Sequence, residues 1–169
     1  MPPIFGQSIR PFIRFFVILL VGVLAGCAIP SAIKPGTTAE VLTQKLGKPT
    51  EVRPGPDGGE SWDYAYGPEG VQTWRYDLDR GRTVRTATQL LTQEQLYRVI
   101  PGTTTEAGVL ALLGKPREKL VLSGETIWEW RVAIGPENGI FVVRFGPDGK
   151  ATGYNVLKDF ISDDRDASP

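Results

Sequence analysis

The chain lacks histidine, has one cysteine among 169 residues, and carries no net charge because 19 basic side chains balance 19 acidic ones. The absence of histidine excludes Ser-His-Asp triads and histidine metal sites, and it removes the most common general base. A single cysteine excludes an internal disulfide, a thiolate zinc site and an iron–sulfur cluster. Without an excess of positive charge, we expect no nucleic-acid binding through a basic surface.

Motifs for catalysis are also missing. The sequence contains neither a Gly-x-Ser-x-Gly elbow nor a Walker loop. The Gly-Pro-Asp-Gly sequences at 55–58 and 146–149 are more typical of turns and loops than of phosphate sites. We therefore expect a protein that is not an enzyme and that uses neither a cofactor nor a metal.

The N-terminal segment has the pattern of a secretory signal. Arg10 and Arg14 precede an apolar run of 11 residues, 15–25. A membrane-spanning helix needs about 20 apolar residues, whereas a basic segment, a short apolar run and small residues predict a signal peptide. The run ends in a sequence that resembles a bacterial lipobox: Leu24, Ala25, Gly26 and Cys27.

The lipobox resemblance implies cleavage before Cys27 and acylation of that cysteine. Several acyl chains are needed for firm anchoring, since a single chain holds only marginally. Ala28 stands where an aspartate would favour inner-membrane retention, so the resemblance implies an outer-membrane lipoprotein that faces the periplasm. The alternative is a free cysteine buried in a short anchor helix.

The rest of the chain contains two copies of one sequence pattern. Pro35-Gly36-Thr37-Thr38 recurs at 101–104, and Leu46-Gly47-Lys48-Pro49 recurs at 113–116. Matches in the same order predict an internal duplication. The expected organisation is a signal peptide at 1–26, an anchor linker at 27–33, a first repeat at 34–91, a connecting helix at 92–100, a second repeat at 101–162 and an acidic tail at 163–169.

Each repeat predicts the same elements. A threonine cap, Thr38 in the first copy, starts a short helix that ends at Gly47, and the second copy ends its helix at Gly114. Apolar and polar residues then alternate with a period of two, which predicts antiparallel strands at 62–66, 74–78, 128–134 and 141–145. Third strands are expected at 83–89 and 151–157. The fold class is therefore α+β, with a short helical segment packed on a three-stranded antiparallel sheet in each repeat.

Matching the apolar faces predicts the strand register. In the first hairpin Trp62 pairs with Tyr76 and Tyr64 with Trp74, and in the second Trp128 pairs with Phe145 and Trp130 with Val143. The polar face would then place Asp63 opposite Arg75 and Glu129 opposite Arg144. With the aromatic face as core, an open charged face remains as the candidate partner surface: Asp63, Arg75, Glu129, Arg131 and Arg144. The reverse assignment, with the aromatic face as an interface, stays open.

The Pro-Gly-x-Thr turn, the Leu-Gly-x-Pro helix end, the Trp-x-Tyr strand and the lipobox together resemble the SmpA/OmlA family of BamE-like outer-membrane lipoproteins. The resemblance covers most of residues 33–160, and the family's pattern occurs there twice, once in each repeat. The tandem arrangement is similar to the β-lactamase-inhibitor-protein fold, in which two such units share an extended antiparallel sheet.

Two functions follow from these resemblances. The first is a non-catalytic scaffold or accessory subunit, held in the outer membrane by acyl chains on Cys27, with subunits of the β-barrel assembly machinery as candidate partners. The alternative is a binding or inhibitor module of the β-lactamase-inhibitor-protein type, which would use an exposed sheet face. Lipid anchoring favours the scaffold, because a secreted inhibitor needs no anchor.

Overall fold

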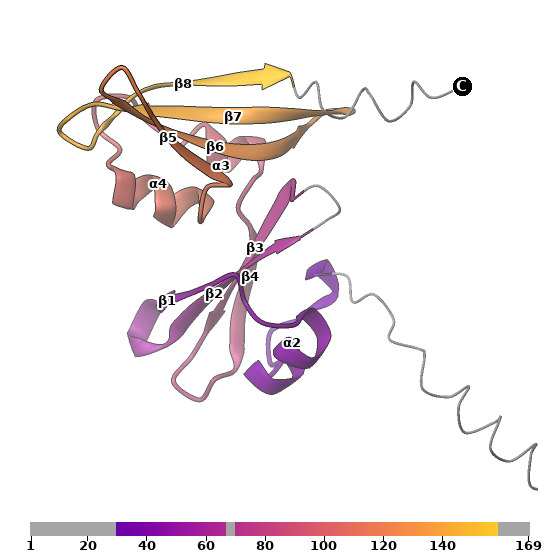
Figure 1. Ribbon diagram of the computed structural model, residues 1–169. Helices are drawn as coiled ribbons and strands as arrows, with labels where there is room; N and C mark the ends of the chain where they lie inside the picture. Colours follow the sequence, from indigo (N-terminus) through magenta and orange to yellow (C-terminus); the bar gives the residue numbers. More distant parts are fainter. Residues whose placement is uncertain (1–29, 67–69, 159–169) are drawn as a thin grey trace, which may run out of the picture.

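The computed structural model describes residues 30–66 and 70–158, which form two four-stranded antiparallel sheets with short helices (Figure 1). Cys27, the lipobox and the acidic tail lie outside the described residues. The first sheet contains β1 (Glu51–Pro54), β2 (Glu60–Tyr66), β3 (Gln72–Leu78) and β4 (Val84–Gln89). The second contains β5 (Glu118–Leu122), β6 (Glu125–Ile134), β7 (Glu137–Phe145) and β8 (Ala151–Lys158). The helices are η2 (Pro30–Ala32), α2 (Ala39–Leu46), η3 (Pro56–Gly58), α3 (Gln93–Leu96) and α4 (Glu106–Leu113).

The α+β class is confirmed, but each sheet has four strands where three were expected. The additional strands are β1 and β5, each of which lies at an edge and pairs only with the following strand. β1 has four residues and ends in Pro54, while every residue of β5 is exposed. β1 alternates between half-buried and exposed residues over only four positions, and β5 has no alternation, so neither gives a strong strand signal in the sequence.

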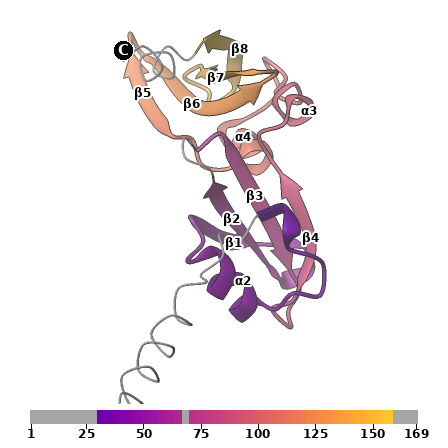
Figure 2. The same cartoon turned by 90° about the vertical axis from the view of Figure 1, so that its right-hand side faces the viewer.

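The two repeats do not share a sheet. The strand orders are β1-β2-β3-β4 and β5-β6-β7-β8, and no ladder joins the two sheets among the described strands (Figure 2). The expectation of one extended sheet, taken from the β-lactamase-inhibitor-protein fold, is therefore wrong for the described part of the chain. Each sheet has its own core, and the contact between the repeats is made by side chains.

The repeated motifs have repeated structural roles. The side-chain oxygens of Thr38 and Thr105 cap α2 and α4, each accepting a hydrogen bond from the backbone N–H three residues further along. Gly47 and Gly114 end these helices with positive φ angles of 80° and 73°. A residue with a Cβ is strained in this conformation, which explains the glycine in both copies.

An aromatic side chain ties each helix end to its sheet. The Tyr64 hydroxyl donates to the Gly47 carbonyl at 3.2 Å, and Trp130 Nε1 donates to the Gly114 carbonyl at 3.2 Å. These bonds satisfy carbonyl groups that have no partner within the helix. The aromatic strand and the Leu-Gly-x-Pro motif therefore form one unit in each repeat.

The helix expected between the repeats is α3, which is only four residues long. Thr92 caps it, since Thr92 Oγ1 accepts from the backbone N–H of Gln95 at 3.4 Å. Leu96 and Val99 enter the core of the second repeat. The connecting segment thus belongs to the second packing unit.

The register is confirmed in the first hairpin and wrong in the second. Asp63 lies opposite Arg75, whereas Glu129 lies opposite Val142 and Arg144 lies opposite Ile127. The reason is a tight turn at Gly135 and Pro136, which pairs Ile134 directly with Glu137 and moves the partners by two residues. A shift of two residues keeps each side chain on the same face of the sheet. The residues predicted for the core are therefore buried there, although their cross-strand partners differ from those predicted.

The aromatic face of each sheet is the core, which decides the alternative left open by the sequence. In the first repeat the buried residues include Trp62, Tyr64, Tyr76 and Leu78, which pack with Leu42 of α2. In the second they include Trp128, Trp130, Phe141 and Phe145, which pack with Val109 and Leu113 of α4. The aromatic residues of the strands therefore stabilise the repeats and are not an open interface.

The start of β2 supplies a prediction for stability. A Cβ added to Gly59 would lie 1.9 Å from the Leu78 carbonyl oxygen, so Gly59→Ala must displace β3 backbone. We expect this substitution to lower the free energy of unfolding by about 1–3 kcal/mol in urea titrations. The control is Gly81→Ala, whose Cβ would meet only the end of the Asp79 side chain, at 3.2 Å. Equal stability of the two variants would contradict the close approach.

Candidate functional site

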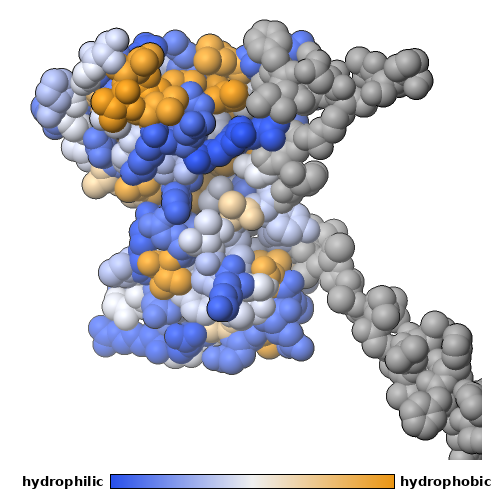
Figure 3. Space-filling view, viewed as in Figure 1, coloured by the Kyte–Doolittle hydropathy of each residue, from blue (hydrophilic) through white to orange (hydrophobic). Residues whose placement is uncertain are grey.

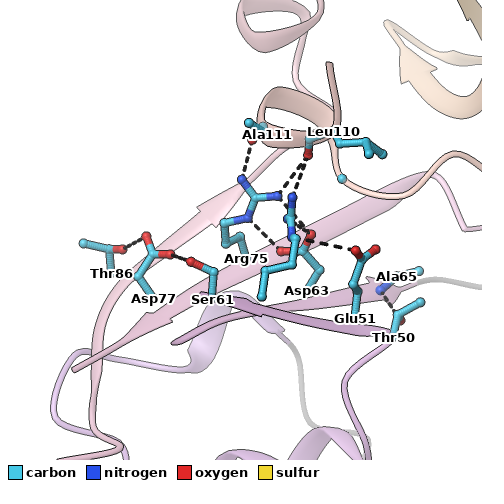
Figure 4. A network of polar contacts seen from close by, with 12 residues as sticks. Thr50, Glu51, Ser61, Asp63, Ala65, Arg75, Asp77, Thr86, Leu110 and Ala111 are labelled. Atoms are coloured by element: carbon cyan, nitrogen blue, oxygen red, sulfur yellow. Dashed lines mark hydrogen bonds and ion pairs between the residues drawn. The ribbon is translucent and has the colours of Figure 1, made fainter. Parts of the chain in front are cut away.

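A buried carboxylate holds two arginines on the face of the first sheet that points away from α2. β2, β3 and β1 place Asp63, Arg75 and Arg53 side by side on this face. Arg75 binds Asp63 through two nitrogens, at 2.7 and 2.9 Å, and Arg53 Nη2 lies 2.5 Å from Asp63 Oδ2 (Figure 4). Asp63 is only 1% exposed. The arginines therefore supply hydrogen bonds to both oxygens of a carboxylate that water does not reach.

Both arginines reach from the first repeat into the second. Arg53 Nη1 donates to the Leu110 carbonyl at 3.0 Å, Arg75 Nη2 donates to the same oxygen at 3.4 Å, and Arg75 Nη1 donates to the Ala111 carbonyl. These carbonyls belong to the last turn of α4. We call Arg53, Asp63, Arg75 and the C-terminal turn of α4 the inter-repeat joint.

The charges of the inter-repeat joint are complementary. Two guanidinium groups are balanced by the carboxylates of Asp63 and Glu51, and the guanidinium groups face the negative end of the α4 dipole. Gly114 allows the close approach, because a Cβ there would lie 3.1 Å from Asp63 Oδ2. The arrangement is therefore suited to joining two folded units.

The five residues of the predicted partner surface are divided by the structure. Asp63 and Arg75 lie in the inter-repeat joint, so the expectation of an open charged face there is wrong. Glu129, Arg131 and Arg144 lie on the outer face of the second sheet, where Arg131 is only 7% exposed. The five residues therefore belong to two separate surfaces.

The outer face of the second sheet mixes apolar and charged side chains. Cross-strand pairing aligns Leu120, Ile127 and Arg144 in one row, Glu118, Glu129, Val142 and Asn155 in the next, and Arg131, Ile140 and Leu157 in the third. The helices α3 and α4 pack on the opposite face (Figure 1). Figure 3 shows apolar side chains gathered at the top of the view, over this sheet. The exposed large apolar residues on the outer face are Leu120, Leu122 and Leu157, whereas Val121 and Val156 lie on the face that carries Trp128 and Phe141.

Arg53 was missed by the sequence analysis, although it completes the inter-repeat joint. It lies on β1, where no strand was predicted, so its alignment with Asp63 could not be deduced. The available signal was the period of two in Glu51-Val52-Arg53, which places Glu51 and Arg53 on the same side. Their side chains lie 3.9 Å apart.

Clefts adjoin the inter-repeat joint. One of about 300 Å³ lies between the repeats and includes Arg75, Asp77, Arg98 and Ala111 among its lining residues. A larger one of about 550 Å³ lies at the β3–β4 turn and shares Asp77. The Asp77 carboxylate accepts hydrogen bonds from Ser61 at 2.5 Å and from Thr86 at 2.8 Å. Its oxygens are therefore already bound within the sheet face.

Comparisons with known proteins give distant structural similarity only. No family profile and no curated protein matches the chain. Solved structures that resemble it include a candidate β-lactamase inhibitor protein of Streptococcus mutans, with 14% identity, 76% of this chain and 86% of that chain covered, and a TM-score of 0.30. A DUF4309 family protein, YjgB of Bacillus subtilis, has 17% identity, 72% and 78% coverage, and a TM-score of 0.27. Similarity at this level assigns neither a family nor a function.

A third similar structure is an extracellular protein with an SCP domain from Bacillus anthracis. It has 18% identity and a TM-score of 0.29, and the match covers 74% of this chain and 44% of that one.

Within residues 30–66 and 70–158, no group of three or more acidic, cysteine or histidine residues could hold a metal ion. In the same ranges, none of the helices combines the length and the apolar character that crossing a bilayer requires.

The inter-repeat joint predicts a large effect of one uncharged substitution. Asp63→Asn leaves two arginines without their carboxylate, and we expect the free energy of unfolding to fall by about 3 kcal/mol. The control is Glu137→Gln, which removes an exposed pair with Lys158 at 3.9 Å and should cost less than about 1 kcal/mol. Urea titrations of both variants measure the difference. Similar small losses would mean that Asp63 does not organise the joint.

Proposed function

We propose that this protein is a lipid-anchored, non-catalytic envelope protein that binds a partner through the outer face of its second sheet. Acyl chains on Cys27 hold it in the outer membrane, facing the periplasm. The candidate partners are subunits of the β-barrel assembly machinery. The partner assignment rests on the sequence resemblance, and the binding face rests on the arrangement of the second sheet.

One observation carries the choice of face. The outer face of the first sheet contacts α4 through Arg53 and Arg75, whereas α3 and α4 leave the outer face of the second sheet uncovered. This second face alternates charged and apolar side chains, a composition that suits a specific protein contact. Glu129 and Arg144 supply opposite charges on it, which can fix the orientation of a partner.

The anchor is supported by the sequence at 10–27. The basic residues, the apolar run of 11 and the Leu24-Ala25-Gly26-Cys27 sequence occur in the order that a lipoprotein signal requires. The alternative function, an inhibitor module, would use the same sheet face but needs no anchor. The two functions therefore differ in what they predict for Cys27.

Replacing Cys27 tests the anchor. We expect Cys27→Ala to lose acylation and to be recovered either uncleaved or in the soluble fraction, because the modified sulfur is absent. Ser31→Ala, a nearby exposed substitution, should leave acylation unchanged. Mass spectrometry of the N-terminal peptide and fractionation of the envelope measure both properties. Normal lipid labelling of the Cys27→Ala variant would contradict the lipoprotein assignment.

Charge reversal tests the binding face. In a mild-detergent pull-down of the tagged protein from native envelope, we expect Arg144→Glu to reduce recovery of the partner about fivefold, the effect of losing one exposed ion pair. Arg85→Glu makes the same change in charge on the first sheet and should have no effect. Recovery of barrel-assembly subunits would support the scaffold, and recovery of a secreted hydrolase would favour the inhibitor module. Equal losses from the two variants would contradict the choice of face.

A further inference from the structure

The chain enters the first repeat almost directly after the proposed acylation site. Pro30 follows Cys27 by three residues and is buried, and its carbonyl oxygen accepts a hydrogen bond from the Tyr76 hydroxyl at 2.8 Å. Ile33 is 5% exposed and belongs to the core of the first repeat. Burial, with a smaller contribution from Tyr64, raises the pKa of Tyr76, which keeps its hydroxyl protonated as the donor. Pro30 and Ile33 are therefore packed against the first repeat, inside the segment 27–33 that was expected to be a linker.

The distance from anchor to fold is therefore short. Three residues span at most about 11 Å. The polar headgroup layer on each side of the hydrocarbon core is about 5–8 Å thick, so an acylated Cys27 holds Pro30 within a few ångströms of the headgroups. We infer that the bilayer surface is the contact partner of the helical side of the first repeat, defined by η2 and α2. This inference rests on the acylation of Cys27 in the proposed function.

The position of Pro30 decides which side of the molecule faces the lipid. Tyr76, its hydrogen-bond donor, lies on the face of the first sheet that is covered by α2 through Leu42. The second repeat is joined to the opposite face of that sheet by Arg53 and Arg75 (Figure 4). The order away from the lipid is therefore η2 and α2, then the first sheet, then the second repeat.

The charges on the helical side fit this placement. Between Pro30 and Thr50 the basic residues are Lys34, Lys45 and Lys48, all exposed, and the one acidic residue is Glu40, whose carboxylate lies 3.8 Å from Arg82. An excess of lysine near a bilayer is attracted to the negative surface potential of anionic lipids. The side that the short connection brings to the membrane is thus the side with excess positive charge.

Site-specific fluorescence tests the orientation. Acylation blocks the sulfur of Cys27, so Gln44→Cys on α2 and Asn155→Cys on the second sheet each give one labelling site in the full chain; both positions are exposed. The acylated proteins are placed in phospholipid vesicles with a quencher attached to the headgroups. We expect the label at 44 to lose most of its fluorescence and the label at 155 to keep it. Equal quenching at both positions, or stronger quenching at 155, would overturn the orientation.

A lengthened connection gives the matched control. Inserting about six Gly and Ser residues after Ala28 adds about 20 Å of reach and should restore the fluorescence at 44. Mass spectrometry of the same samples separates this inference from the proposed function. An unmodified Cys27 overturns both the anchor and the orientation. An acylated Cys27 with an unquenched label at 44 overturns the orientation alone and leaves the anchor intact.

Discussion

The arrangement of the two repeats depends on one buried carboxylate. Asp63 binds Arg53 and Arg75 together, and further N–H groups of both arginines donate to the carbonyls of Leu110 and Ala111. Those carbonyls lie in the last turn of α4, where the Leu110 oxygen also accepts a hydrogen bond from the backbone N–H of Gly114 at 3.0 Å. A carboxylate on one sheet thus positions the two arginines that bind the helix end of the other repeat.

This contact also determines which surfaces are available for binding. It covers part of the polar face of the first sheet, whose other face is covered by α2. The second sheet differs because its helices lie on one side only, and its opposite side carries the rows that contain Glu129, Val142 and Arg144. Packing therefore distinguishes the two sheets. Both faces of the first sheet are in contact with a helix, whereas the second sheet has one face that no helix covers.

Local chemistry could be predicted from the sequence, and long-range contacts could not. Thr38, Gly47 and Gly114 act as expected because caps and positive φ angles depend on a few neighbouring residues. The aromatic core was predictable because a period of two survives even a wrong register. The turn at Gly135 is shorter than expected, and only the folded chain shows that Arg144 is opposite Ile127. The inter-repeat joint could not be foreseen, since it links an unrecognised strand to main-chain oxygens that have no signature in the sequence.

The two copies differ at one pair of equivalent positions that matters for assembly. Asp63 and Arg75 are paired in the first sheet, and the corresponding pair in the second sheet is Glu129 and Val142. The first sheet therefore has a receptor for a helix end, and that receptor is filled by the molecule's own α4. In the second sheet the residue opposite the carboxylate is Val142, which has no donor for a helix end, and Arg144 lies opposite Ile127. Head-to-tail growth into a filament needs a free receptor at one end and a matching group at the other. The receptor of the first sheet is occupied by α4 of the same molecule, so Arg53 and Arg75 are not free to hold a helix end of another copy.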